Sequence, residues 1–272
     1  MGITNSESFE IPEGRSGVVL GALRRELTPL LADVEIQQKI RIDRLKFWIA
    51  RYRSLRLIVA QTGVGPVRAT EAARRTLSSF SVKFFISVGF ACSLKPQIGI
   101  GDVILGERFF YLDIDPQNEY LADQGLLHIA EQSCGQSFSP GGPAIPGENT
   151  RVFKGSILTV HRMIDTAVEK REIAGRTDAI ALDMESAAIA EVAANAKIPY
   201  LSVRVISDVL DENLQGAAKF ISASGDFQFL KGFWALLGHP ARFAHLYRLR
   251  SDTRIAANQL TRFFQGFLPK LD

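Results

Sequence analysis

The chain has 272 residues, of which 46% are hydrophobic and 22% are charged, and this composition is typical of a soluble globular protein with a substantial core. The net charge of +3 is too small to indicate nucleic-acid binding, and no apolar run approaches the roughly 18 residues that span a bilayer. Two cysteines, Cys92 and Cys134, are too few for a disulfide framework and fit a reducing compartment. Because the polar first residues lack the apolar stretch of a signal peptide, we expect a cytoplasmic protein.

Short apolar runs rich in β-branched residues alternate with helix-like segments along the chain. After a polar leader, residues 1–16, the run "SGVVLGAL" predicts a buried first strand that opens into a helix near Leu23. Further strands are predicted at 55–60, 82–89, 101–106, 155–160, 179–182 and 199–207, and helices at 66–79, 123–134, 161–174 and 184–196. This order predicts one α/β domain, residues 17–272, built as a three-layer sandwich with a central mixed β-sheet between helices. Residues 134–150, rich in Gly, Pro and Ser, predict a long surface loop.

The Gly-rich turn "TGVGPVRA" (62–69) follows a predicted strand and enters a helix. A dinucleotide-binding turn requires a third glycine where Arg68 stands, and an acid about twenty residues further on, which is missing. The turn is therefore either a tight strand-to-helix connection or a place where backbone N–H groups approach a small anion or a ribose. The four histidines are scattered, and no G-x-S-x-G or C-x-x-C motif occurs, so we expect no metal and no cofactor.

Acidic residues stand at the ends of several predicted strands. Glu26 follows the first strand, Asp183 and Glu185 follow 179–182, and Asp208 follows 199–207. In α/β sheets, ligands bind outside the carboxyl ends of the strands, so these acids could share one pocket. The alternative is that each acid caps the following helix, and Asp183 stands where an N-cap belongs. Glu185 fits this alternative less well, because the alanines around it predict burial, which is costly for an unpaired carboxylate.

The stretch "ALDMESAAIAEVAANAKIPYLSVRVISD" closely resembles the signature of the nucleoside phosphorylase and methylthioadenosine/S-adenosylhomocysteine nucleosidase superfamily. The segments "GALRREL", "TGVGPVRA" and "ISVGFACSLKPQIGIGDVIL" resemble its first glutamate-bearing turn, its second turn and its T-G-S-A-G-G-L turn. All the motifs occur in family order, and the resemblance covers about residues 17 to 210. It implies the nucleoside phosphorylase-like fold and an enzyme that cleaves the N-glycosidic bond of a purine nucleoside, with adenine as the expected base.

The resemblance also implies roles for particular residues. Asp208 would deliver a proton to the purine N7, Glu26 would orient or deprotonate the attacking water, and Arg204 would hold that water and the nearby acids. Glu185 would grip the ribose hydroxyls while Met184 packs on the sugar. The remaining residues that the motifs place at the base or in the turns around the ligand are Met163, Ile164, Gly63, Gly89, Phe90 and Ala91.

The sequence departs from the family pattern in the turn around the sugar. Phe90 replaces a serine, and Cys92 and Ser93 replace glycines, which favours a more apolar pocket and leaves open a nucleoside-binding protein without catalysis. Arginines stand at 24 and 25 in place of acids. Together with Arg68 they are either a phosphate site or solvated surface charges, so the nucleophile is water or phosphate. A methylthioadenosine/S-adenosylhomocysteine nucleosidase proper is a further alternative.

Two segments extend the resemblance to the branch associated with hopanoid biosynthesis, which removes adenine from an adenosyl-hopane lipid. They are "GALRREL" and the C-terminal tail, whose charged residues from 231 onward are seven basic and two acidic. The tail predicts basic amphipathic helices over about 226–268, which either reach a membrane surface or pack on the core. We expect the other partners to be a small-molecule nucleoside, a second copy of the chain in a homo-oligomer, and no nucleic acid.

Overall fold

The computed structural model describes residues 14–112, 119–134, 151–212 and 240–272, with side chains from Thr253 onward in the last segment. The predicted leader (1–16) lies almost entirely outside the described residues, and so does the predicted loop (134–150). The strands are β1 (Ser16–Gly21), β2 (Glu35–Ile42), β3 (Leu45–Tyr52), β4 (Leu55–Gln61), β5 (Val82–Ser93), β6 (Val103–Tyr111), β7 (Tyr120–Leu121), β8 (Val152–Thr159), β9 (Ala181–Asp183) and β10 (Tyr200–Asp208). The helices are α1 (Arg24–Asp33), α2 (Pro66–Ser79), α3 (Gln124–Ser133), α4 (Ala167–Arg176), α5 (Ser186–Asn195) and α7 (Pro240–Leu271).

One mixed sheet organises the described part of the chain. Its strand order is β10-β6-β8-β9-β5-β1-β4-β3-β2, and β10 also pairs with β5. The strands β5, β10, β6, β8 and β9 therefore close into a ring, and the long strand β5 belongs both to this ring and to the open half of the sheet. Strands β4, β1, β5 and β10 are mutually parallel, so their carboxyl ends lie at the same edge.

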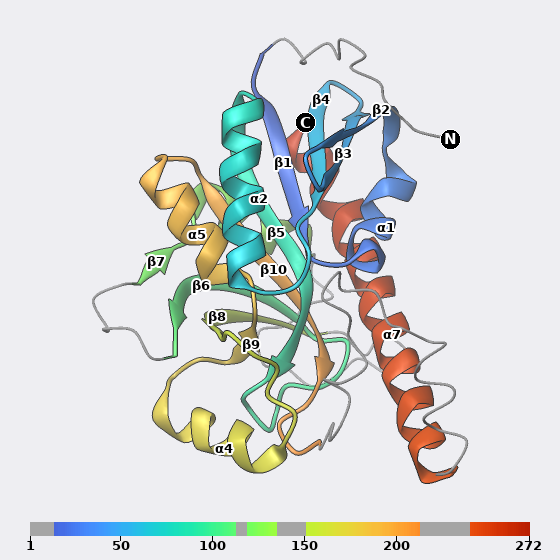
Figure 1. Ribbon diagram of the computed structural model, residues 1–272, viewed down its shortest axis with the longest axis vertical. Helices are drawn as coiled ribbons and strands as arrows, with labels where there is room; N and C mark the ends of the chain where they lie inside the picture. Colours follow the sequence, from blue (N-terminus) through green and yellow to red (C-terminus); the bar gives the residue numbers. More distant parts are fainter. Residues whose placement is uncertain (1–13, 113–118, 135–150, 213–239) are drawn as a thin grey trace.

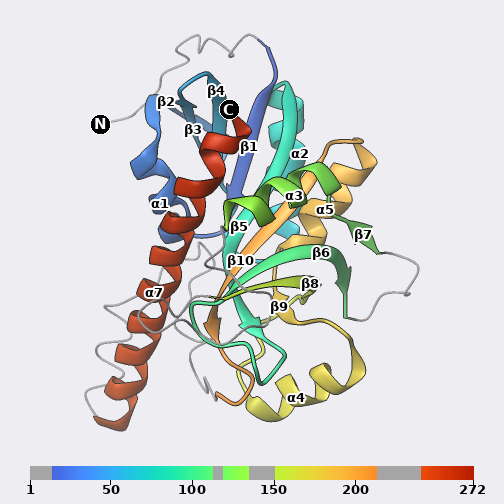
Figure 2. The ribbon, with the colours of Figure 1, turned by 180° about the vertical axis from the view of Figure 1, so that it is seen from behind.

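Helices cover both faces of the sheet, as the sequence predicted. Helices α2 and α5 pack together on the face seen in Figure 1. Helix α7 packs against α1, α3 and β10 on the opposite face, which Figure 2 shows from behind. The prediction of a mixed sheet flanked by helices is confirmed.

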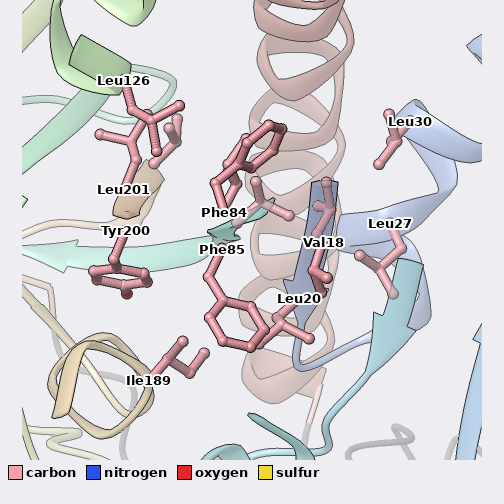
Figure 3. Close-up of a cluster of buried hydrophobic side chains, with 14 of the residues drawn as sticks. Val18, Leu20, Leu27, Leu30, Phe84, Phe85, Leu126, Ile189, Tyr200 and Leu201 are labelled. Carbon is pink, nitrogen blue, oxygen red and sulfur yellow. The ribbon is translucent and has the colours of Figure 1, made fainter. Parts of the chain in front are cut away.

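The core lies where the central strands meet these helices. Figure 3 shows Phe84 and Phe85 of β5 between side chains of β1, namely Val18 and Leu20, and Leu201 of β10. All five side chains are at most 4% exposed. The described end of α7 completes this core through residues that are each at most 3% exposed, which are Ala256, Leu260, Phe263, Phe264, Phe267 and Leu268. The rigid packing around β1, β5 and β10 fixes the strand ends that carry the acidic residues.

The structure corrects the predicted helix at 161–174, which begins six residues later, at Ala167. The side chain of Thr166 accepts a hydrogen bond from the backbone N–H of Glu169 and caps α4. Residues 161–166 are therefore a connection between β8 and α4. Within the described ranges, no helix is both long and apolar enough to cross a membrane.

Candidate active site

Glu26 lies in the first turn of α1, directly after β1. Its Oε2 accepts a 2.7 Å hydrogen bond from the backbone N–H of Leu23, and its Oε1 accepts a 3.2 Å bond from that of Phe90 on β5. The side chain is 4% exposed. Burial raises the pKa of Glu26, while the two backbone donors and the positive charge of Arg204 oppose the rise. The carboxyl group is thus fixed between two strand ends and can hold a small nucleophile in a defined position.

Gly89 of β5 allows two functional side chains to approach each other. A Cβ atom at this position would lie 3.1 Å from Oε1 of Glu26 and 3.5 Å from Nη1 of Arg204. Arg204 lies opposite Gly89 in the parallel pairing of β10 with β5. A side chain here would therefore separate the carboxylate from the guanidinium, which explains why the position requires a glycine.

Arg204 is the largest fully buried side chain of the described residues, and Asp183 neutralises it. Its Nε lies 2.7 Å from Oδ2 of Asp183, and its Nη2 donates a 2.8 Å bond to Ser87 Oγ. Burial alone would lower the pKa of Arg204, but Asp183 and the nearby carboxyl groups raise it above its ordinary value. The guanidinium therefore stays charged beside Glu26 and Glu185.

Asp183 connects the start of α5 with β8 and with Arg204. It accepts hydrogen bonds from the backbone N–H of Ser186 and from Thr159 Oγ1, the latter at 2.7 Å. The N-cap residue of α5 is Glu185 and not Asp183 as predicted, although the Asp183 carboxylate bonds to the backbone at the start of this helix and also carries the ion pair with Arg204. Thr159, Ser186 and Ser87 were not identified from the sequence, because isolated Ser and Thr residues carry no spacing signal.

Glu185 stands at the start of α5 and bonds to the Gly-rich turn after β4. Its Oε1 accepts a 2.9 Å hydrogen bond from the backbone N–H of Gly65, whose φ of +102° favours glycine. Burial, reinforced by the carboxyl groups of Asp183 and Glu26, raises the pKa of Glu185 to about 8. Such a carboxyl group can both donate and accept hydrogen bonds near neutral pH, as a partner of sugar hydroxyls must.

Asp208 ends β10 and pairs with Cys92 of β5. Both of its oxygens lie 2.7 Å from the Nζ of Lys170, which is fully buried in α4. Burial raises the pKa of Asp208 to about 6, although the ammonium of Lys170 opposes the rise. Burial also raises the pKa of the Cys92 thiol, so this side chain is a neutral neighbour of the carboxyl group. Asp208 is therefore poised to exchange a proton near neutral pH.

An apolar cluster lies next to Asp208. Its members include Cys92, Leu94, Leu158, Val160, Ile164 and Leu182, and the partly buried Met184 packs against it. Ile164 is 4% exposed, and the partly buried Met163 precedes it in the connection between β8 and α4. The two residues predicted to contact the base therefore lie in or next to a buried apolar cluster.

The other predicted residues lie on β5 and in the Gly-rich turn after β4, so Phe90 and Ala91 belong to a strand and not to the predicted turn. Phe90 is partly exposed, with the guanidinium of Arg25 5.7 Å from its ring centre, while Ala91 is buried. Gly63 has a φ of +82°, and a Cβ there would lie 3.0 Å from the Cδ of Arg68. The strand ends therefore bring Glu26, Glu185 and Arg204 together, with Asp208 four residues beyond Arg204 on β10. Lys170 is a buried charged residue that the sequence did not reveal, because a lysine in a polar helix looks like a surface residue.

The arrangement has the groups for acid–base chemistry on a small polar ligand. Three carboxyl groups with raised pKa values follow β1, β9 and β10, of which β9 is antiparallel to β5, and one buried guanidinium lies on β10, close to an apolar cluster. The described residues contain no group of three or more His, Cys, Asp or Glu side chains able to hold a metal ion.

Comparison with known proteins defines the family to which the chain belongs. Residues 16–228 match the model of the phosphorylase superfamily, and the chain belongs to this family. It is 29% identical over 210 residues to a 5'-methylthioadenosine/S-adenosylhomocysteine nucleosidase of Listeria monocytogenes, covering 71% of this chain and 86% of that protein. It is 25% identical to an aminodeoxyfutalosine nucleosidase of Campylobacter jejuni, covering 72% and 87%.

Solved structures show the same fold. The 5'-methylthioadenosine/S-adenosylhomocysteine nucleosidase of Neisseria meningitidis, in complex with methylthio-immucillin-A, superposes with a TM-score of 0.72 at 19% identity, covering 93% of this chain and 98% of that one. The futalosine hydrolase of Helicobacter pylori superposes with a TM-score of 0.71 at 18% identity, covering 94% and 97%. The expected nucleoside phosphorylase-like fold is confirmed.

Proposed function

We propose that this protein is an enzyme that cleaves the N-glycosidic bond of a purine nucleoside, with adenine as the base. The observation that carries the proposal is the meeting of Glu26, Glu185 and Arg204 at one sheet edge, with Asp208 at the end of the same strand as Arg204. Similarity to nucleosidases and membership of the phosphorylase superfamily support the same reaction class.

In the proposed reaction, cleavage leaves positive charge on the sugar and negative charge on the departing purine. Asp208 gives its proton to the purine N7, so that the base leaves as a neutral molecule. Glu185 binds the ribose hydroxyls and, when ionised, stabilises the developing oxocarbenium ion. Glu26, held by two backbone N–H groups and near Arg204, orients the nucleophile for attack on the sugar carbon.

Asp208→Asn tests the proposed acid, because the amide keeps the shape but cannot give up a proton. General acid catalysis contributes roughly 10²- to 10⁴-fold, so base release from adenosine derivatives should fall by at least about 100-fold. Base release is measured chromatographically, with thermal unfolding as the control for folding. Full activity of Asp208→Asn together with full activity of Glu26→Gln would contradict the assignment.

Water is the nucleophile that the curated relatives favour, because those named here are nucleosidases. Phosphate is the second candidate, and the observation in its favour is Arg25, whose guanidinium lies over the ring of Phe90 at the edge of the site. Reactions with and without inorganic phosphate decide between them. Free sugar in both reactions supports water, whereas a sugar 1-phosphate formed only with phosphate supports phosphorolysis.

We further propose that the substrate carries a lipid on the ribose 5' carbon and that the protein contacts a membrane surface through its basic tail. Within residues 253–272 the side chains of Ala256, Leu260, Phe263, Phe264, Phe267 and Leu268 lie in the core, which favours the packed-helix alternative for this segment. The proposal therefore concerns residues 226–252, of which 226–239 lie outside the described residues. Truncation would remove core phenylalanines, so the test replaces Lys231, Arg242, Arg248 and Arg250 by glutamine. Flotation with anionic vesicles should be lost in this variant, and unchanged flotation would contradict the membrane contact.

A cytoplasmic homo-oligomer is the remaining part of the proposal, and the family resemblance supports it. Light scattering of the purified protein measures the assembly, and a monomer at micromolar concentration would contradict it.

A further inference from the structure

The least expected charge in the structure is the ammonium group of Lys170. The side chain is fully buried. Its Nζ contacts both oxygens of Asp208 at 2.7 Å and donates to the backbone carbonyls of Val209 at 3.1 Å and Glu212 at 2.9 Å. All three N–H bonds of the ammonium therefore have partners, and each partner belongs to Asp208 or to the turn that follows it.

Two physical effects oppose an ammonium at this position. Removal of a charge from water is costly unless a counter-ion and hydrogen bonds replace the water. Lys170 also lies near the start of α4, where the helix dipole repels cations. A side chain needed only for packing would be apolar, so the charge itself indicates a role towards Asp208.

We propose that Lys170 is a positioning residue for Asp208: it fixes the carboxyl group at the end of β10 and stabilises the carboxylate that remains after proton transfer to the departing purine. This inference rests on the proposed function. The Oδ–H bond of Asp208 breaks and an N7–H bond forms on the purine, while the pair of electrons of the glycosidic bond goes to the base. The carboxylate so formed faces the ammonium, and it recovers its proton from water before the next turnover.

Two charged groups and one neutral thiol face Asp208. Lys170 of α4 lowers the pKa of Asp208, Glu212 after β10 raises it, and the neutral thiol of Cys92 on β5 lowers it by hydrogen bonding. Burial is the largest effect, and it raises the pKa. Removal of the ammonium leaves burial and Glu212 in place, so the carboxyl group should hold its proton to higher pH.

The test is the pH profile of kcat/KM for base release by the full-length protein and its Lys170→Met variant. Asp208 must be protonated to donate, so the rate falls as pH rises through its pKa, which is about 6 in the wild type. In the variant this falling limb should move upward by at least about one pH unit, since a close opposite charge shifts a carboxyl pKa by about 1–3 units. At low pH, where both proteins are protonated, kcat should be about 10-fold lower in the variant, because the product carboxylate is less stable.

Two further variants separate this role from a structural one. Lys170→Arg keeps the charge and should keep the falling limb near its wild-type position. Lys154→Met removes a half-exposed lysine that pairs with Glu131 on the surface and should change nothing. A lysine that only supports the turn would lower kcat equally at every pH and leave the limb unmoved, and that result would overturn the inference while the proposed function stood.

Thermal unfolding of each variant is the control for folding. If Lys170→Met does not fold, Lys170→Gln replaces it, because the amide keeps a donor for the two carbonyls. The pH profile of the wild-type protein is a second test, and we expect its falling limb below pH 7. A falling limb above pH 8 would show that the ammonium of Lys170 does not lower the pKa of Asp208, and would overturn the inference. No base release by the wild-type protein would overturn the proposed function, and with it this inference.

Discussion

Replacement of Asp183 by alanine should destabilise the protein strongly. The carboxylate is buried and binds Arg204 Nε at 2.7 Å, Thr159 Oγ1 at 2.7 Å and the backbone N–H of Ser186. Removal of one partner from a buried ion pair leaves the other charge uncompensated and typically costs about 3–5 kcal/mol. For a domain of this size each kcal/mol lowers Tm by about 2–4 °C, so Tm should fall by about 6–20 °C.

A surface ion pair provides the matched control. Asp178 pairs with Arg108, but its side chain is 65% exposed, so water replaces the lost partner. Asp178→Ala should therefore change the free energy of unfolding by less than about 1 kcal/mol. Urea denaturation of the two alanine variants, followed by circular dichroism, measures both values under the same conditions.

A double-mutant cycle tests the cause. Arg204→Met removes the buried cation, so the loss in the double variant Asp183→Ala/Arg204→Met should be smaller than the sum of the single losses by about 1–3 kcal/mol. If the two losses add, Asp183 and Arg204 do not stabilise each other measurably. A change below about 1 kcal/mol in Asp183→Ala alone would refute the argument that the unpaired guanidinium is costly.

Further predictions concern Glu185 and the turn that binds it. Because burial raises its pKa from 4.5 to about 8, the wild-type carboxyl group favours folding fully below about pH 4.5 and loses this contribution as pH rises towards 8. Glu185→Gln should therefore gain stability relative to the wild type as pH rises from about 5 to about 8, by about 1.4 kcal/mol per pH unit. Urea denaturation at each pH measures this, and a difference in the free energy of unfolding that stays constant with pH would contradict it. Gly65→Ala has room for the Cβ but a φ of +102°, so it should cost about 1–3 kcal/mol and raise KM several-fold. Gly175→Ala, exposed in α4 with ordinary φ, should instead be neutral or stabilise slightly, as thermal unfolding would show.

The ends of the parallel strands were predictable because buried strands leave a simple signal. The apolar runs of β1, β4, β5 and β10 stand out from the polar connections. An acid that follows such a run must lie near the end of a buried strand. The hairpin β2–β3 was missed although β2 alternates exposed and half-buried residues. Its two-residue turn has Asp43 at a φ of +53° in place of a glycine, so the usual turn signal is missing.

The sequence by itself determined most of the buried strands and the helices between them, the family resemblance and the acidic residues that follow strands, because these depend on local composition and spacing. Only the tertiary structure decided which charges face each other. The pairing of Asp183 with Arg204 and of Lys170 with Asp208 joins residues 21 and 38 positions apart, through the ring in which β5, β10, β6, β8 and β9 close. Electrostatic energy depends on distance and burial in space, and the chain acquires both only when these strands pair.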